Sequence, residues 1–311
     1  MSVLELEDVS KWYGDVVALN DVSLDLEAGL TGLVGPNGAG KTTLLGLLTG
    51  QLEPSTGRLR VLGEDPWGNA QLRERIGFVP ETLSLWEERT GRDHAHLAAD
   101  LTETGTRSAA DDWLARVGLA EAADRPAGGY SRGMRQRLKL AMALVHEPEL
   151  LVLDEPFGGL DPVGRREMME LLTDIDEAGR SILFSSHVLH EIETLTREIV
   201  VLVGGRIVAQ GDIHRIRDIM DEHPHKITIR LGQPRELATS LIAHDDVVRV
   251  RVSEPTDDDP GEVLAETRAP DVFYDRLRDT ILEEGYDIQE LLSPDDNLQA
   301  VFNYLTKGAS E

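Results

Sequence analysis

A glycine-rich segment at residues 35–43, GPNGAGKTT, contains residue types that bind phosphate groups. It follows an apolar run at 30–34 and precedes an apolar helical pattern at 44–48, so we expect a strand, a loop and a helix. The glycines let backbone N–H groups turn inward and form an anion site at a helix N-terminus. Lys41 adds a charge for the β- and γ-phosphates, and the Thr42 hydroxyl is suited to ligate Mg²⁺. The predicted nucleoside triphosphate site comprises Gly35, Pro36, Asn37, Gly38, Ala39, Gly40, Lys41, Thr42 and Thr43.

Two acidic residues end a second apolar run, LLVLDEP at 150–156. Such a run fits a strand buried on both faces of a parallel sheet, which presents ligands at the carboxyl ends of its strands. Asp154 is predicted to hold Mg²⁺, directly or through water. Glu155 is predicted to orient and deprotonate the attacking water. Together with segment 35–43, this acid pair predicts nucleotide hydrolysis.

Three further motifs accompany these two: YSRGMRQRL at 130–138, GGLDP at 158–162 and ILFSSH at 182–187. In order and spacing, the five motifs resemble the nucleotide-binding subunit of an ATP-binding-cassette (ABC) transporter over about residues 1–215. The resemblance implies an α/β P-loop NTPase (ABC ATPase) domain with an inserted helical lobe and an antiparallel β edge. It also implies ATP as the nucleotide and Mg²⁺ as its metal.

Ser131 and Gly133 match the family's LSGGQ signature, whereas Tyr130, Arg132 and Met134 depart from it. The variant resembles the branch that exports drugs, sodium, copper or polysaccharides. A serine and a glycine before an amphipathic helix also make an N-terminal anion site. In the family, each ATP lies between the loop of one subunit and the signature of its partner. Ser131 and Gly133 are therefore expected to bind ATP in trans, in a homodimer or a heterodimer with a similar cassette.

Four more positions acquire expected roles from the resemblance. Tyr13 matches the aromatic residue that stacks on adenine, and we prefer it to its neighbour Trp12. His187 matches the histidine that senses the γ-phosphate, although a lone histidine is more often a satisfied core residue. Glu81 stands where most cassettes have glutamine; its carboxylate can approach Mg²⁺, but its charge would repel the γ-phosphate unless the metal intervenes. Asp161 resembles the residue that communicates between the two sites.

Length and composition bound the protein class. The 311 residues suffice for one large α/β domain and a smaller one, and the absence of cysteine excludes a disulfide framework. The acidic N-terminus lacks the apolar stretch of a signal peptide, and no window has the roughly 18–20 apolar residues of a membrane span. We therefore expect a cytoplasmic subunit held at the inner face of the cell membrane by a separate permease.

The charge balance is strongly acidic, with 57 Asp and Glu against 31 Lys and Arg and a net charge of −26. Such a surface repels nucleic acid, so no nucleic-acid partner is expected. Only five of the basic residues are lysines, which is unusual even for an acidic protein. The balance favours a salt-in cytoplasm, as in halophilic archaea, where a Debye length of about 3 Å at molar salt screens the repulsion.

The chain divides into an expected ABC ATPase domain at 1–220 and an accessory domain at 225–311. Residues 1–30 alternate like the strands of an antiparallel edge, and residues 86–146 carry the patterns of a helical lobe. Two glycines at 204–205 predict a hairpin turn. By resemblance, the segment after residue 81 receives a short helix of the permease. Its expected contacts, Leu83, Leu85 and Trp86, are equally compatible with packing inside the lobe.

The accessory domain has the order strand, helix, strand, strand, helix, strand, which is that of a small α+β, ferredoxin-like unit. A last helix, NLQAVFNYLTKG, is expected at 297–308. No catalytic constellation stands out in this region, so dimer support or regulation is the expected role.

Two other functions remain open. One is a soluble ABC ATPase that acts on ribosomes or DNA, although such proteins usually carry two cassettes or a long coiled coil, and this chain has one cassette and no sustained heptads. The other is a non-catalytic regulator, which would be expected to lack the acid at 155 or the histidine at 187; both are present.

Overall fold

The computed structural model describes residues 2–213, 215–216, 224–255 and 260–292. The chain forms two compact units, Met1–Asp212 and Ile213–Glu311, each with its own hydrophobic core. The division after Asp212 comes earlier than the expected boundary at 220–225, because the last strand of the large sheet ends at this residue. The helix expected at 297–308 lies outside the described residues.

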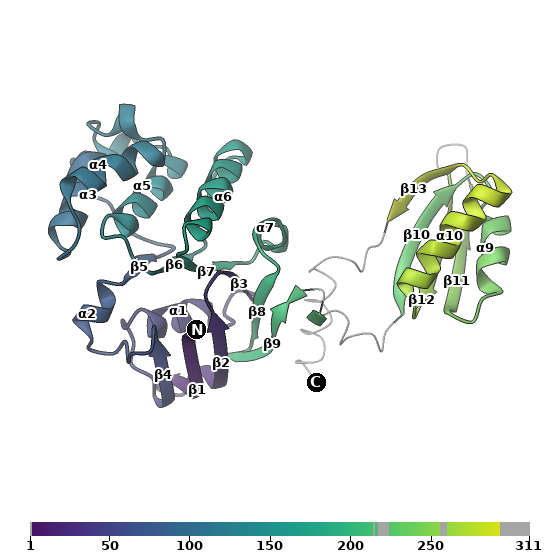
Figure 1. The fold of residues 1–311 in the computed structure, drawn as a ribbon, viewed down its shortest axis with the longest axis horizontal. Coiled ribbons are helices and arrows are strands. Elements are labelled where there is room, and N and C mark those ends of the chain that lie inside the picture. The colour runs from purple at the N-terminus through teal and green to yellow at the C-terminus, as the bar shows by residue number, and fades with distance from the viewer. Residues whose placement is uncertain (1, 214, 217–223, 256–259, 293–311) are drawn as a thin grey trace. The chain divides into compact units, whose positions relative to one another are not determined.

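A six-stranded sheet forms the centre of the first unit (Figure 1). Its strands lie in the order β5 (Ile76–Val79), β6 (Leu150–Asp154), β7 (Ser181–Ser186), β3 (Leu30–Val34), β8 (Glu198–Val203) and β9 (Arg206–Asp212). The first five are parallel, and β9 is antiparallel to β8. Strands β3, β6 and β7 are buried along their whole length, as expected for central strands of a parallel sheet covered on both faces. The expected hairpin joins β8 to β9, with positive φ at Gly204 and Gly205.

A three-stranded antiparallel sheet confirms the alternation expected for residues 1–30. Its order is β2 (Val16–Glu27), β1 (Ser2–Tyr13) and β4 (Thr56–Val61). Helix α1 (Lys41–Leu48) buries its leucines in a core that strands of both sheets share. The phosphate-binding segment therefore lies between a buried strand and a buried helix, which fixes it at both ends.

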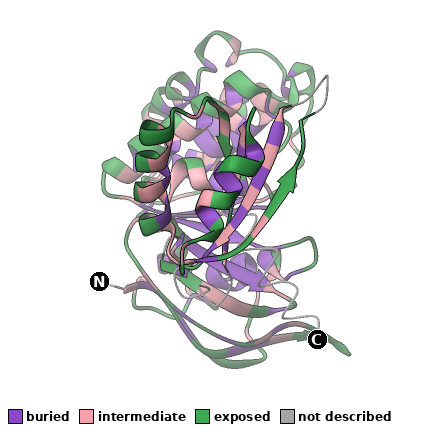
Figure 2. Ribbon diagram, turned by 90° about the vertical axis from the view of Figure 1, so that its right-hand side faces the viewer, coloured by how far each residue is buried: buried purple, intermediate pink, exposed green. Residues whose placement is uncertain are grey.

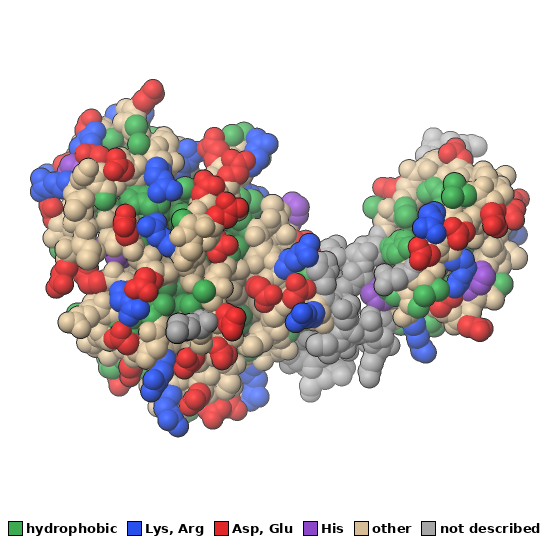
Figure 3. Space-filling model, in the orientation of Figure 1, with side chains coloured by type: hydrophobic (Ala, Val, Ile, Leu, Met, Phe, Trp, Pro, Cys, Tyr) green, Lys and Arg blue, Asp and Glu red, His purple; other side chains and the backbone are tan. Residues whose placement is uncertain are grey.

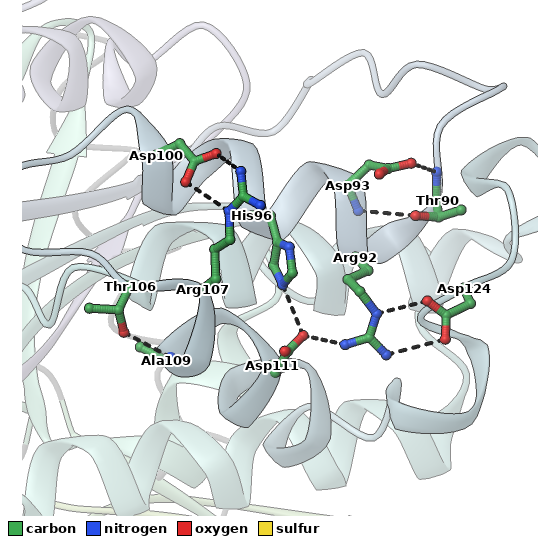
Figure 4. A network of polar contacts seen from close by, with 10 residues as sticks. All are labelled: Thr90, Arg92, Asp93, His96, Asp100, Thr106, Arg107, Ala109, Asp111 and Asp124. Carbon is green, nitrogen blue, oxygen red and sulfur yellow. Dashed lines mark hydrogen bonds and ion pairs between the residues drawn. The ribbon is translucent and has the colours of Figure 1, made fainter.

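Helices α3 (Gly91–Asp100), α4 (Arg107–Arg116) and α5 (Arg132–Leu144) form the expected helical lobe (Figure 1). Polar side chains join its parts (Figure 4): the Arg92 guanidinium contacts Asp111 on α4 and Asp124, and His96 contacts the same Asp111 carboxylate. The remaining helices of this unit are α2 (Ala70–Arg73), α6 (Pro162–Glu177) and α7 (Leu189–Leu195), with short 3-10 turns at Ala120–Ala122 and Ala127–Gly129.

The second unit is a four-stranded antiparallel sheet with two helices. The sheet order is β11 (Val247–Ser253), β12 (Gly261–Thr267), β10 (His225–Leu231) and β13 (Ile288–Leu292), with α9 (Pro234–Ile242) after β10 and α10 (Pro270–Glu284) after β12. This is the expected βαββαβ order. Along β10 and β12, buried positions alternate with less buried ones (Figure 2), and the buried residues form a core with both helices that includes Phe273.

On the face shown in Figure 3, acidic side chains are spread over both units, with Lys and Arg side chains among them. Several arginines bridge acids from distant segments; Arg75, for example, contacts both Glu64 and Glu149. In the described part of the chain, no helix combines the length and apolarity needed to cross a membrane.

Candidate active site

The glycine-rich segment lines an open cleft of about 840 Å³ in the first unit. Gly40 begins α1 with φ 105°, and a side chain here would come within 2.6 Å of the Ala18 carbonyl. Glycine is therefore required for both its backbone conformation and its small size. Because no side chain caps α1, the N–H groups of its first turn are left for a ligand. The loop has the form that phosphate binding needs.

Lys41 is buried beneath this loop. Its ammonium donates to the carbonyls of Gly35 (2.7 Å) and Pro36 (3.3 Å). It also lies 3.9 Å from Oε1 of Glu155, which joins the phosphate loop to the end of β6. The lysine charge is thus held between the loop and the catalytic carboxylate expected from the sequence.

Asp154 is buried at the end of β6, and each of its carboxylate oxygens has a hydrogen-bond donor. The Thr42 hydroxyl donates to Oδ2 (2.9 Å), and the Ser185 hydroxyl on β7 donates to Oδ1 (2.6 Å). Ser185 also accepts a hydrogen bond from the backbone N–H of Glu155 (2.9 Å). One serine therefore orients both acids.

Glu155 has a left-handed backbone, with φ 49°. For a residue with a side chain, this conformation costs about 1–2 kcal/mol. It is held by the bond from its N–H to Ser185 and by the Gly158 N–H, which donates to its carbonyl (3.1 Å). The carboxylate lines the cleft, where Oε2 lies 2.8 Å from Nδ1 of His187. The His187 ring is 57% exposed, so it is not a buried core histidine.

The Thr42–Asp154 pair offers the donor set for Mg²⁺. Within the described residues, no three or more His, Cys, Asp or Glu side chains gather into a metal site. Magnesium in nucleotide enzymes needs fewer protein ligands, because phosphate and water oxygens complete its octahedron. A hydroxyl and a carboxylate 2.9 Å apart beside the phosphate loop fit that requirement.

The rim of the cleft contains the start of β2, where Val16 and Val17 are exposed. Tyr13 does not line the cleft, but it pairs with Val16 across the hairpin, so it lies next to the rim. Its ring is also half-exposed and has the Lys11 ammonium 5.4 Å from its centroid. The structure thus adds two apolar cleft residues that sequence reasoning missed.

Besides Tyr13, the expected site residues Gly35, Ser131, Gly133 and Asp161 lie outside the cleft lining. Ser131 caps α5 by accepting from the Met134 N–H (3.3 Å), and Asp161 caps α6 by accepting from the Gly164 N–H (2.7 Å). Ser131 and Asp161 thus each have a structural role at a helix N-terminus.

Comparison with known proteins identifies the family of the chain. The family model described as ABC transporter matches residues 19–158. An uncharacterised ABC transporter ATP-binding protein of Nostoc sp. is 42% identical, over 69% of this chain and 68% of its own length. The Nod factor export ATP-binding protein I of Rhizobium johnstonii is 35% identical, over 97% of this chain and 94% of its own length. The chain belongs to the ABC transporter ATP-binding proteins.

A solved structure of an ATP-binding subunit of an ABC transporter agrees with the fold. It is 31% identical, has a TM-score of 0.64, and is matched over 70% of this chain and 93% of its own. The P-loop fold expected from the motifs is therefore confirmed, and the chain is an ABC ATPase that binds and hydrolyses ATP.

In this ABC ATPase, Glu81 and Lys139 also line the cleft, on its helical-lobe side. The Glu81 side chain is exposed, as expected for a residue that reaches into the cleft, whereas Lys139 is buried. Sequence reasoning named Glu81 and missed Lys139. The only signal for the lysine is its place among the apolar residues of α5, next to Leu138 and Leu140.

Proposed function

We propose that this ABC ATPase is the energy-coupling subunit of an exporter and acts on a separate membrane permease at the inner face of the membrane. The observation that carries the proposal is the convergence of Lys41, Asp154, Glu155 and His187 on one cleft beside the phosphate loop. Export is supported by the signature variant and by the export relative, which aligns along almost the whole chain.

Each residue of the cleft has a role in this proposal. The loop N–H groups and Lys41 bind the β- and γ-phosphates, and Thr42 and Asp154 hold the metal. Bound Mg²⁺ would neutralise charge on those phosphates. Glu155 accepts the proton of the attacking water, while His187, in contact with Oε2, keeps the carboxylate in place and reaches the γ-phosphate.

Dimerisation follows from the placement of the signature. Cassettes of this family dimerise and work with membrane permease components. Ser131 and Gly133 lie outside the cleft that contains the chain's own phosphate loop, so they are available to the ATP of a second cassette. A homodimer, or a heterodimer with a similar cassette, would complete two sites. ATP would favour the closed dimer, and ADP would favour it less.

The permease contact is proposed at the segment after β5. Trp86 is 62% exposed and Leu83 is 39% exposed, whereas Leu85 is half-buried. Two exposed apolar side chains on one short segment are better placed against a helix of a membrane protein than against water.

The experiment is affinity purification of the tagged chain from native membranes, solubilised in high salt, with mass spectrometry of the proteins that accompany it. A stoichiometric multi-span membrane protein is expected, and Trp86→Glu should lose it. Trp67→Glu is the matched control, since Trp67 is similarly exposed (46%) but lies outside this segment. Recovery of the tagged chain alone, or with ribosomes, would contradict the transporter assignment.

A further inference from the structure

Lys139 is a buried cation on α5 with two acceptors from neighbouring peptide groups. Its side chain is 8% exposed, and its ammonium donates to the carbonyls of Glu81 (2.8 Å) and Pro80 (3.4 Å). Those two residues directly follow β5, at the point where the chain leaves the central sheet for the helical lobe. Lys139 therefore joins α5 to the start of the segment that carries Glu81.

Burial of the Lys139 ammonium costs free energy that an apolar side chain at this position would not cost. Burial lowers the pKa of Lys139, and the nearby Glu81 carboxylate only partly offsets this. In the described part of the chain, no carboxylate oxygen lies within ion-pairing distance of its ammonium. A methionine would fill the same volume without burying a charge. The specific contribution of the lysine is its donation to the two carbonyls.

The rest of the segment is also attached to the lobe. His94 on α3 accepts from the Trp86 N–H through Nε2 (3.0 Å), while its Nδ1 donates to the Thr90 carbonyl (2.8 Å). The Gly128 N–H donates to the Glu87 carbonyl (2.9 Å). Thr90 and Asp93 then form the capping box that begins α3 (Figure 4). Segment 80–90 is thus hydrogen-bonded to α3, to α5 and to the turn that contains Gly128.

We propose that Lys139 is a positioning residue for ATP hydrolysis: by holding the peptide groups of Pro80 and Glu81, it fixes where the Glu81 carboxylate stands in the cleft. The same bonds make segment 80–90 move with α5. This inference rests on the proposed function and on the role expected for Glu81 from the sequence, that of a carboxylate that approaches Mg²⁺ from the helical-lobe side of the cleft.

The test is a double-mutant cycle on the full-length chain with ATP hydrolysis as the readout. Lys139→Met and Glu81→Ala should each lower kcat about tenfold. This is less than the loss of about a hundredfold in rate that a catalytic group misplaced by about 1 Å can cause. The ATP dissociation constant should change less than about threefold, because the phosphate loop is untouched. If Lys139 acts through Glu81, the double variant should be no slower than the slower single variant.

Two further variants separate positioning from general structure. Lys139→Arg keeps the donors and should restore kcat to within about threefold of wild type. Arg107→Met is the matched control, because it removes from the same lobe a cation that pairs, within the described residues, with the exposed Asp100. Its kcat should be unchanged. Where Lys139→Met does not fold, Lys139→Gln takes its place in the cycle.

Multiplicative losses in the double variant would overturn the proposal, as would a kcat for Lys139→Met equal to wild type. Failure of Lys139→Arg to restore turnover would also contradict it, because the donors would then be irrelevant. Loss of activity in Glu155→Gln, measured alongside, shows that the hydrolysis belongs to this site. A negative result for Lys139 is then separate from a failure of the proposed function.

Discussion

Ser185 is the residue whose replacement most directly tests the architecture of the active site. It is fully buried on β7, donates to Oδ1 of Asp154 and accepts from the N–H of Glu155. Ser185→Ala removes both bonds and leaves no group to replace them. We expect a loss of stability and a loss of turnover, with nucleotide binding largely retained because the phosphate loop is unaltered.

The size of the stability loss follows from the two groups that lose a partner. A hydrogen bond to a charged group contributes about 1.5–3 kcal/mol, and an unsatisfied buried N–H costs roughly 1–3 kcal/mol. Because the cleft lets water reach part of the site, we expect the sum to be about 2–4 kcal/mol. For a unit of this size, the midpoint of thermal unfolding should fall by about 4–15 °C. Turnover should fall about tenfold or more, since Glu155 loses a bond that holds its left-handed backbone.

The assay pairs thermal unfolding, followed by circular dichroism, with phosphate release and binding of a fluorescent ATP analogue. Ser186→Ala is the matched control. Ser186 is the next residue on β7 and equally buried, and its hydroxyl bonds Glu191 (2.6 Å) and the Val188 backbone rather than Asp154 or Glu155. Ser186→Ala should lose about as much stability as Ser185→Ala, but it should keep clearly more of its turnover. Equal losses of kcat in the two variants, or unchanged turnover in Ser185→Ala, would refute the reasoning.

Three other outcomes test the remaining assignments. Glu155→Gln should bind ATP normally and hydrolyse it about a hundredfold more slowly or worse, in a phosphate-release assay, and normal turnover would remove the base assignment. Lys41→Ala should weaken nucleotide affinity itself by about tenfold or more in a binding titration, and unchanged affinity would count against the phosphate loop. Raising KCl from 0.1 to 2 M should raise the unfolding midpoint of a chain with net charge −26, whereas a falling or constant midpoint would contradict the halophile hypothesis.

The parts of the site that could be predicted are those with strong local signals. Segment 35–43 needs glycines in fixed places, because its N–H groups must turn inward next to a strand and a helix, and the structure has that order. Asp154 and Glu155 could be predicted because a run of apolar residues ending in acids indicates the carboxyl end of a buried parallel strand. The two segments lie close together because the parallel sheet brings the carboxyl ends of its strands to the same edge.

The parts that could not be predicted depend on side-chain partners far apart in the chain. Ser185 contacts Asp154 only because β6 and β7 pair in the register that places them opposite each other. A serine in a buried strand gives no sign of that register. Lys139 interrupts the apolar pattern of α5, but nothing local indicates that its acceptors are the carbonyls at 80 and 81. The partners of Ser185 and Lys139 can therefore be identified only from the tertiary structure.

The departure from the signature motif at Tyr130 changes how the motif is anchored, and Ser131 still caps α5. Tyr130 is buried, and its hydroxyl donates to the Ala122 carbonyl (2.7 Å) and packs against Gly91, where any side chain would collide with it. Tyr130 therefore anchors the residue before Ser131 to two other parts of the helical lobe. Because a large aromatic side chain with a hydrogen bond fixes that position more firmly than leucine would, the Ser131 hydroxyl and the start of α5 retain a defined place. The variant signature thus still presents a serine and a helix N-terminus, the two groups that the proposed phosphate binding in trans would use.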